Sequence, residues 1–208
     1  MKPSGFSCGN HSELATHAGL LTSLRGGREI FLSAYFASNS AMNYFEIFGL
    51  PVRLKVNKTD LPKRFFELSR KFHPDFYANA IPGEKEKSLE ITADLNKAFK
   101  TFQNEDETIK YVLKLKGLLE EEEKYQLPPD FLMEVLEINE KLMDAEDDPN
   151  LKLHLHTAIN NLQSAIYEPV KNIIESYQDG ITSEKELLQV KEYYYKKKYL
   201  TRIRKELA

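Results

Sequence analysis

The chain has 208 residues, of which 41% are hydrophobic and 29% are charged, and its formal net charge is −3 at pH 7. A chain of this length can bury one core of moderate size or two small ones. No apolar run approaches the roughly 20 residues needed to span a bilayer, which argues against a membrane protein. The single cysteine, Cys8, excludes an intrachain disulfide and a Cys-x-x-Cys metal site, and it fits a reducing compartment.

Residues 1–41 are rich in Ser, Gly and Ala and contain three Lys or Arg against two Asp or Glu. Three interpretations compete: an overextended start site, a disordered extension, or an organellar transit peptide. The basic bias is too weak for a transit peptide, and a secretory signal would need a clean apolar stretch after a basic start. We favour an overextended start and expect a cytoplasmic protein. The mitochondrial matrix is the alternative if the segment is a transit peptide.

Two apolar stripes at helical spacing flank a His-Pro-Asp tripeptide. The stripes comprise Leu61, Phe65, Leu68 and Phe72 before it, and Ile91, Leu95, Ala98 and Phe102 after it. Two such helices joined by a short loop can bury their stripes against each other as an antiparallel hairpin. Proline disfavours a helical conformation of the residue before it, so the first helix should end near Phe72 or His73. The tripeptide His73-Pro74-Asp75 should then lie at the exposed tip.

The first helix of this hairpin has a basic face opposite its apolar stripe. Lys63, Arg64, Arg70 and Lys71 point away from the stripe, and only Glu67 interrupts them. For an isolated helix the pattern favours an ordinary solvated face, and a surface that binds an acidic partner is the alternative.

Charge and composition divide the rest of the chain. Residues 42–118 contain 14 Lys and Arg against 11 Asp and Glu, whereas residues 119–208 contain 12 against 19. Gly117, four consecutive glutamates and two consecutive prolines mark the junction, a composition that favours a solvated linker. We therefore predict domains at residues 42–118 and 130–208, joined by a linker at residues 119–129.

The second domain should begin with two helices. The first is expected to start around Asp130 as the N-cap and to end in the acidic stretch of residues 144–148. In the second, Asp148 should cap the helix and Pro149 should occupy its first position. Pro169 lies inside this second helix and predicts a bend or break there.

A third helix should follow, because Ser183 and Glu186 have the spacing of a capping box. The simplest closure of these three helices is an antiparallel bundle. The predicted fold class is therefore all-α, with a helical hairpin followed by a three-helix bundle.

The first helix of the bundle carries two apolar stripes. Phe131, Val135, Ile138 and Leu142 make a sufficient core stripe, and Leu132, Leu136 and Met143 form another, with Met133 further round. The second stripe needs a partner as well. It is either part of a broad core face or an exposed docking surface, and periodicity leaves both open.

Three segments, in this order, resemble the HscB family of iron–sulfur co-chaperones: MNYFEIFGLP at 42–51, LSRKFHPD at 68–75, and FLMEVLE at 131–137. The resemblance covers most of residues 42–208. It implies a J-domain with a short first helix at 42–118 and a scaffold-binding three-helix domain at 130–208. It also implies a co-chaperone with no catalytic activity and no cofactor.

The same resemblance implies two partner surfaces. The first would bind a DnaK/HscA-type heat-shock ATPase and stimulate it; its residues are His73, Pro74, Asp75, Lys63, Arg64, Arg70 and Lys71. The second would bind an IscU-type iron–sulfur scaffold protein; its residues are Leu132, Met133, Leu136, Glu137, Glu140 and Tyr199. Two positions depart from the common pattern. Phe76 stands where many J-domains have a basic residue, and Tyr199 stands where a phenylalanine is often found.

Other functions compete with this one. The chain could be a generic J-domain co-chaperone whose helical half dimerises, even weakly, or binds another client. The aromatic and basic run of residues 193–199 would suit a nucleic-acid adapter, but the surrounding half is acidic, so we expect no nucleic-acid partner. A metal site is not expected either, because His154 and His156 would point about 160° apart on a helix.

Overall fold

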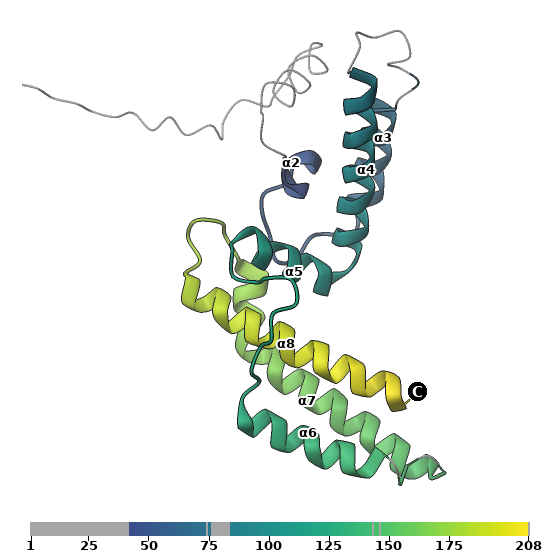
Figure 1. Cartoon of the computed structure of the whole chain (residues 1–208), viewed down its shortest axis with the longest axis vertical. Helices are drawn as coiled ribbons and strands as arrows, with labels where there is room; N and C mark the ends of the chain where they lie inside the picture. Colours follow the sequence, from purple (N-terminus) through teal and green to yellow (C-terminus); the bar gives the residue numbers. More distant parts are fainter. Residues whose placement is uncertain (1–41, 74, 76–83, 143, 146, 208) are drawn as a thin grey trace, which may run out of the picture. The chain divides into compact units, whose positions relative to one another are not determined.

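The computed structural model describes residues 42–73, 75, 84–142, 144–145 and 147–207, and every regular element in these ranges is a helix. The helices are α2 (Tyr44–Phe48), α3 (Leu61–Lys71), α4 (Glu84–Gln103), α5 (Glu105–Leu115), α6 (Pro129–Leu142), α7 (Pro149–Ser176) and α8 (Glu184–Leu207) (Figure 1). Within the described ranges, no helix is both long and apolar enough to cross a membrane. The segment before residue 42, on which the start-site interpretations depend, lies outside the described residues.

The helices α3 and α4 form the predicted antiparallel hairpin and lie side by side in Figure 1. All four residues of the α4 stripe are at most 2% exposed, and so are Leu61 and Phe72 of the other stripe. Phe65 stacks on Phe99 with their ring centroids 4.2 Å apart. The first helix ends at Lys71, as the proline rule predicts, and the Phe72 amide donates to the Leu68 carbonyl at 2.9 Å.

The short helix α2 closes one end of this hairpin. A capping box fixes its start: the Glu46 amide donates to the Asn43 side chain, and the Asn43 amide donates to the Glu46 carboxylate. The helix then places Phe45 and Phe48 against Phe102, with ring centroids 4.7 and 5.4 Å away. The J-domain core is therefore aromatic at this end.

A fourth helix of the J-domain, α5, extends the predicted hairpin. Asn104 caps it by accepting hydrogen bonds from the amides of Asp106 and Glu107. Its inner face buries Ile109, Val112 and Leu113. The sequence pattern did not predict α5 as a separate helix. Only Asn104 separates it from α4, so the sequence shows no loop between the two helices.

The helices α6, α7 and α8 form the predicted three-helix bundle, with two corrections. The first concerns the start of α6, which is Pro129 rather than a cap at Asp130. The Pro128 carbonyl accepts the Leu132 amide at 3.1 Å. Proline is well suited to a first helical position, and Asp130 lies in the first turn, where its charge complements the helix dipole.

The second correction concerns Pro169, for which a bend or a break was expected. The helix α7 is continuous from Pro149 to Ser176, so the break is absent, and the bend stays a prediction. A proline inside a helix costs about 3 kcal/mol, so other interactions must offset it. The packing of α7 against α8 provides them, since Val170 and Ile174 are buried and α7 and α8 form the most extensive pair of helices. The predicted cap at Asp148 is confirmed by bonds from the amides of Asn150 and Leu151.

The predicted capping box of α8 is also present. The Ser183 amide donates to the Glu186 carboxylate at 2.8 Å, and the Glu186 amide donates to the Ser183 hydroxyl oxygen at 3.3 Å. The helix buries Leu200 and Ile203 among residues of α6 and α7. The bundle therefore has its own apolar core.

Most residues of the segment between α5 and α6 are exposed, as its composition predicts, but part of the segment packs against the rest of the chain. Leu119 is 6% exposed. The Lys191 ammonium donates to the Glu123 carboxylate at 2.5 Å, and the rings of Tyr125 and Tyr195 stack 4.5 Å apart. The run of glutamates is acidic enough to look solvated, but part of it pairs with lysines that lie elsewhere in the chain.

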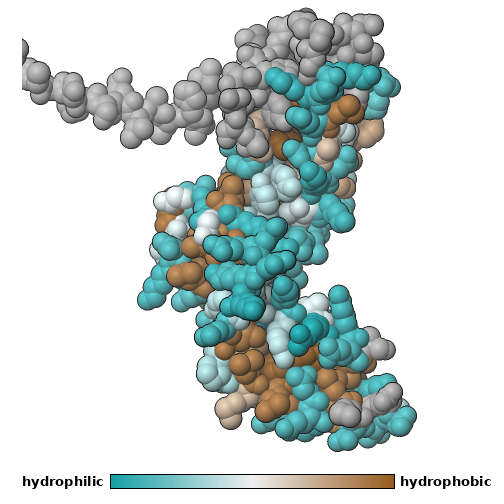
Figure 2. All heavy atoms as spheres, viewed as in Figure 1, coloured by the Kyte–Doolittle hydropathy of each residue, from teal (hydrophilic) through white to brown (hydrophobic). Residues whose placement is uncertain are grey.

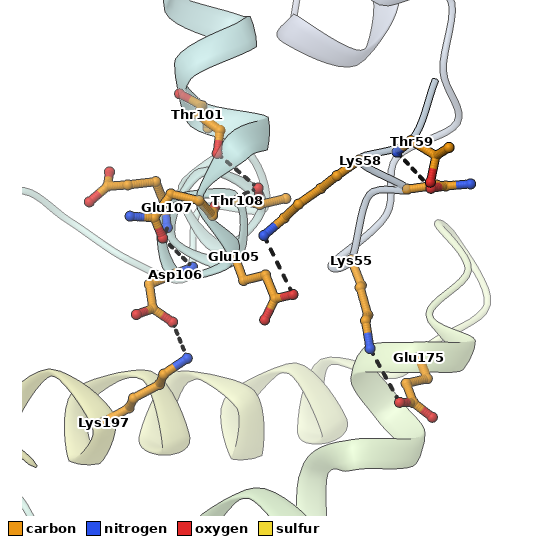
Figure 3. Close-up of polar contacts among 12 residues, drawn as sticks. Lys55, Lys58, Thr59, Thr101, Glu105, Asp106, Glu107, Thr108, Glu175 and Lys197 are labelled. Atoms are coloured by element: carbon orange, nitrogen blue, oxygen red, sulfur yellow. Dashed lines mark hydrogen bonds and ion pairs between the residues drawn. The ribbon is translucent and has the colours of Figure 1, made fainter. Parts of the chain in front are cut away.

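One hydrophobic cluster joins residues of the J-domain to the C-terminal part of α7 and the N-terminal part of α8. It includes Leu54 and Leu113 together with Val170, Ile174 and Val190. Figure 3 shows three ion pairs of this part of the chain. Lys197 pairs with Asp106, Lys55 with Glu175, and Lys58 with Glu105, at 2.5, 3.4 and 3.7 Å. The J-domain and the bundle thus share buried apolar surface.

Candidate partner-binding surfaces

The tip of the α3–α4 hairpin presents the side chains of His73 and Asp75. These side chains are 53% and 88% exposed, and the His73 Nδ1 atom lies 3.6 Å from the Asp75 carboxylate. The Asp75 amide also donates to the same nitrogen at 3.3 Å. Pro74 lies outside the described residues, as does Phe76. Both polar side chains of the tripeptide are therefore accessible to a partner.

The backbone just before this tip is anchored from α4. The Phe72 carbonyl oxygen accepts the Ser88 hydroxyl at 2.7 Å and the Thr92 hydroxyl at 3.1 Å. Ser88 is 2% exposed, and Phe72 is equally buried. The last carbonyls of a helix lack partners within the helix, so these hydroxyls satisfy a group that would otherwise be unpaired. Sequence reasoning did not find them, because Ser88 and Thr92 look like ordinary polar residues of α4.

The basic face of α3 is exposed at Lys63, Arg64 and Arg70, and Lys71 is half-buried. Arg64 also has a structural role. Its Nη1 atom donates to the carbonyl oxygens of Phe48 and Gly49 at 2.7 and 3.1 Å, which holds the end of α2. Arg64 is therefore partly engaged within the chain, whereas Arg70 is oriented towards the surface.

An exposed aromatic ring lies within this basic face. Phe66 is 62% exposed, and the guanidinium carbon of Arg70 lies 5.8 Å from the ring centroid. The two residues are four apart on α3, so they are neighbours on its surface. Sequence reasoning missed Phe66 because the residue falls outside the apolar stripe. An apolar ring flanked by cations is the composition of a protein-binding surface rather than of a purely solvated face.

The structure decides between the two interpretations of the second stripe on α6. The core stripe is filled, since Phe131, Val135 and Ile138 are at most 7% exposed. The exposed fractions of the second set are large: 41% for Leu132, 69% for Met133 and 56% for Leu136. Glu137 and Glu140 are also exposed, and Met143 lies outside the described residues. The second stripe is therefore surface and not core.

Hydrophobic side chains gather over α6 in the lower part of Figure 2. Tyr199 of α8 borders this region: its ring lies edge-on to Phe131 at 6.4 Å, and Arg202 covers it at 4.6 Å. The tyrosine is half-buried, so it belongs both to the margin of the bundle core and to the surface. Clustered exposed apolar side chains of this kind commonly mark an interaction site.

The aromatic and basic run of α8 is largely structural. Tyr193 and Tyr194 are buried, and Lys197 pairs with Asp106. Burial alone would lower the pKa of Lys197, but the hydrogen bond to Asp106 and the nearby Tyr193 hydroxyl outweigh it and raise the pKa above its ordinary value. Among the described residues, no three His, Cys, Asp or Glu side chains come together as metal ligands would.

Comparisons with known proteins agree with this architecture. Residues 127–208 match the family described as HSCB C-terminal oligomerisation domain. The chain is 33% identical over 172 residues to a Co-chaperone protein HscB homolog from Shewanella halifaxensis, and the match covers 80% of this chain and 95% of that protein. It is 26% identical over 147 residues to the Iron-sulfur cluster co-chaperone protein HscB homolog of Arabidopsis thaliana, covering 71% of this chain and 55% of the relative.

Two solved structures share the fold. The crystal structure of human co-chaperone protein HscB matches with a TM-score of 0.65 and 26% identity, over 82% of each chain. The chaperone HscB from Vibrio cholerae matches with a TM-score of 0.58 and 24% identity, over 80% of this chain and 95% of that one. A J-domain followed by a helical bundle, together with these sequence matches, shows that the chain belongs to the HscB family of iron–sulfur cluster co-chaperones.

Proposed function

We propose that the protein stimulates ATP hydrolysis by a DnaK/HscA-type chaperone and delivers an IscU-type iron–sulfur scaffold protein to it. One observation carries the proposal: Leu132, Met133 and Leu136 are exposed on a helix whose core face is already filled. An exposed apolar surface on a separate helical bundle is suited to hold a client protein near the J-domain tip. The resemblance to HscB supplies the identity of that client.

The J-domain surface would act through charge and position. The basic residues Lys63 and Arg70 would steer the protein towards an acidic surface on the ATPase, which raises the association rate. His73 and Asp75 would then contact the ATPase itself. Because one chain carries both surfaces, binding of the scaffold raises its effective concentration at the chaperone.

The tip is tested by His73→Gln and Asp75→Asn in a single-turnover ATPase assay with the purified chaperone. Both variants should lose stimulation while their melting temperatures stay close to that of the parent chain, since substitutions at exposed sites usually change stability by under about 0.5 kcal/mol. The matched control is His154→Gln, which changes an exposed histidine of α7. Full stimulation by the His73 variant would contradict the J-domain function.

The scaffold surface is tested by Leu132→Ala combined with Leu136→Ala. Interface anchors contribute about 2 kcal/mol or more each, so scaffold affinity should fall by at least about a hundredfold. The melting curve should hardly move, because both side chains are exposed; a core leucine would cost about 2–5 kcal/mol. Leu153→Ala is the matched control, since Leu153 is 67% exposed on α7. Undiminished scaffold affinity in the double variant would contradict client delivery.

A second candidate is self-association through α6, which the family description of residues 127–208 as an oligomerisation domain favours. The chain would then be a J-domain co-chaperone that dimerises through the exposed leucines. Sedimentation equilibrium separates the two candidates. The second candidate would be favoured by two results together. The parent chain should form a dimer and not bind the scaffold, and the Leu132→Ala, Leu136→Ala variant should be a monomer.

A further inference from the structure

A groove with a volume of about 860 Å³ runs along α8, beside α5 and the segment that precedes α6. Tyrosine rings form part of its wall, and cations lie along its α8 side. The residues that matter here are Tyr125, Tyr195, Tyr199, Lys198, Arg202 and Lys205. The three cations are four and three residues apart, so they lie on one face of the helix. Apart from Tyr199, none of these residues belongs to the two proposed partner surfaces.

The cations of the groove are largely unused within the chain. Among the described residues, no hydrogen bond or ion pair is made by the ammonium groups of Lys124, Lys198 and Lys205. Arg202 lies 3.8 Å from Glu206, one turn further along α8. A concentration of unpaired lysines is unexpected here, because residues 119–208 carry more acidic than basic side chains.

The acidic residues that line the groove are, by contrast, already paired. Their partners are Lys197 for Asp106, Lys110 for Glu107 and Lys191 for Glu123. The paired lysines of α8, Lys191 and Lys197, precede Lys198 along the helix, so the pairs lie away from the end of α8 that carries Lys205. The groove therefore has a neutralised end and a cationic end, and an anionic ligand would be attracted to the second.

The length of the cationic end sets the size of the ligand. From Tyr195 to Lys205 the helix rises about 15 Å, since each residue adds about 1.5 Å. An extended peptide of about five residues covers the same distance. Alternate side chains of such a peptide lie about 6.6 Å apart on one face, which approximates the rise of about 6 Å between Lys198 and Arg202.

We propose that this groove binds an extended acidic peptide segment of a partner protein. Carboxylates at alternate positions would bind Lys198, Arg202 and Lys205. This inference goes beyond the proposed chaperone and scaffold functions, and it does not depend on either of them.

A single-stranded nucleic acid fits the groove less well. Its bases would need free aromatic faces for stacking. The faces of Tyr125 and Tyr195 are occupied by each other, and Arg202 covers the Tyr199 ring. Carboxylates presented by an extended peptide need only the cations of α8 and no free aromatic face.

The test uses the full chain and a short fluorescein-labelled peptide in which glutamate alternates with serine and leucine. Fluorescence anisotropy should show binding that weakens with salt. The variant Lys198→Glu with Lys205→Glu should reduce the affinity at least about tenfold. The matched control, Lys152→Glu with Lys185→Glu, changes two lysines outside the groove and should bind as the parent chain does. The same peptide with glutamine in place of glutamate should not bind.

Three outcomes would overturn the proposal. The first is equal affinity of the parent chain and the groove variant for the acidic peptide. The second is the absence of any binding by the parent chain at low salt. The third is tighter binding of an oligothymidylate that requires Lys198 and Lys205, which would make the groove a nucleic-acid site. If charge reversal disturbs folding, Lys198→Ala with Lys205→Ala gives the same comparison, and neither assay contains chaperone or scaffold.

Discussion

The Ser88 hydroxyl of α4 donates a hydrogen bond to the Phe72 carbonyl oxygen at 2.7 Å, one residue before His73. Thr92 reaches the same oxygen from one turn further along α4. The backbone that leads into the tip is thus tied to the neighbouring helix. These hydroxyls are positioning groups: they fix the backbone of Phe72, and with it the position of the exposed His73 that follows.

We predict that Ser88→Ala lowers stimulation of the ATPase more than its effect on folding explains. Loss of this buried hydrogen bond should cost about 0.5–1.5 kcal/mol of unfolding free energy, because the Thr92 hydroxyl still donates to the Phe72 carbonyl. The maximal stimulation should fall severalfold at a temperature at which the variant is fully folded. Thr157→Val is the control, since the Thr157 hydroxyl bonds only within its own helix. If stimulation is unchanged, the Ser88 hydroxyl serves only stability.

Arg64 and Arg70 should differ in what their substitution affects. Arg64→Ala removes both hydrogen bonds to the end of α2 and should lower the unfolding free energy by about 1 kcal/mol. Arg70→Glu should leave stability within about 0.5 kcal/mol and weaken chaperone binding, with the largest effect at low salt. Urea denaturation and a chaperone titration at two salt concentrations measure both quantities. Identical profiles for the two variants would contradict this division of roles.

Phe66→Ala should weaken chaperone binding in a way that salt does not remove. The ring contributes apolar contact area, whereas the lysines and arginines contribute screened charge. The expected loss is about 1–2 kcal/mol of binding free energy, or roughly five- to thirtyfold in affinity. Leu89→Ala is the control, because Leu89 is 50% exposed and belongs to α4 rather than to the basic helix α3. An equal loss in both variants would show that the effect is not specific to the basic face.

Tyr177 should make the protein sensitive to alkaline pH. Burial and the nearby Asp179 carboxylate raise the pKa of Tyr177 to about 12. A raised pKa in the folded state stabilises the fold below pH 10, and that contribution is lost as the pH rises towards 12. The parent chain should therefore lose about 2–3 kcal/mol more than Tyr177→Phe between pH 10 and 12. Urea denaturation across this range gives the difference, and parallel curves would contradict it.

The helices α3, α4, α6, α7 and α8 could be predicted because their signals are local. The capping groups Asp148, Ser183 and Glu186 act on amides two or three residues away, and the stripes recur within short windows. The positions that sequence reasoning missed depend on distant partners. Whether Pro169 breaks α7 depends on packing against α8, and the attachment of Glu123, in the segment before α6, depends on Lys191 of α8.

The candidate surfaces show the same limit. Periodicity identified two stripes on α6 but could not decide which was exposed, because exposure depends on where α7 and α8 lie. Periodicity placed Arg64 on the basic face. The hydrogen bonds from Arg64 to Phe48 and Gly49 could not be predicted, because they depend on the position of α2. The role of Ser88 could not be predicted, because a single hydroxyl on a helix forms no periodic pattern in the sequence. Tertiary contacts supply what local patterns lack.

The hydrophobic cluster that joins the J-domain to α7 and α8 has a consequence for dissection of the protein. A fragment that starts at residue 127, where the family match begins, would leave Val170, Ile174 and Val190 without Leu54 and Leu113. Such a fragment should adhere to other copies through its uncovered core. An oligomer of this fragment would form through apolar surface that the J-domain covers in the intact chain. The intact chain should melt in a single cooperative transition.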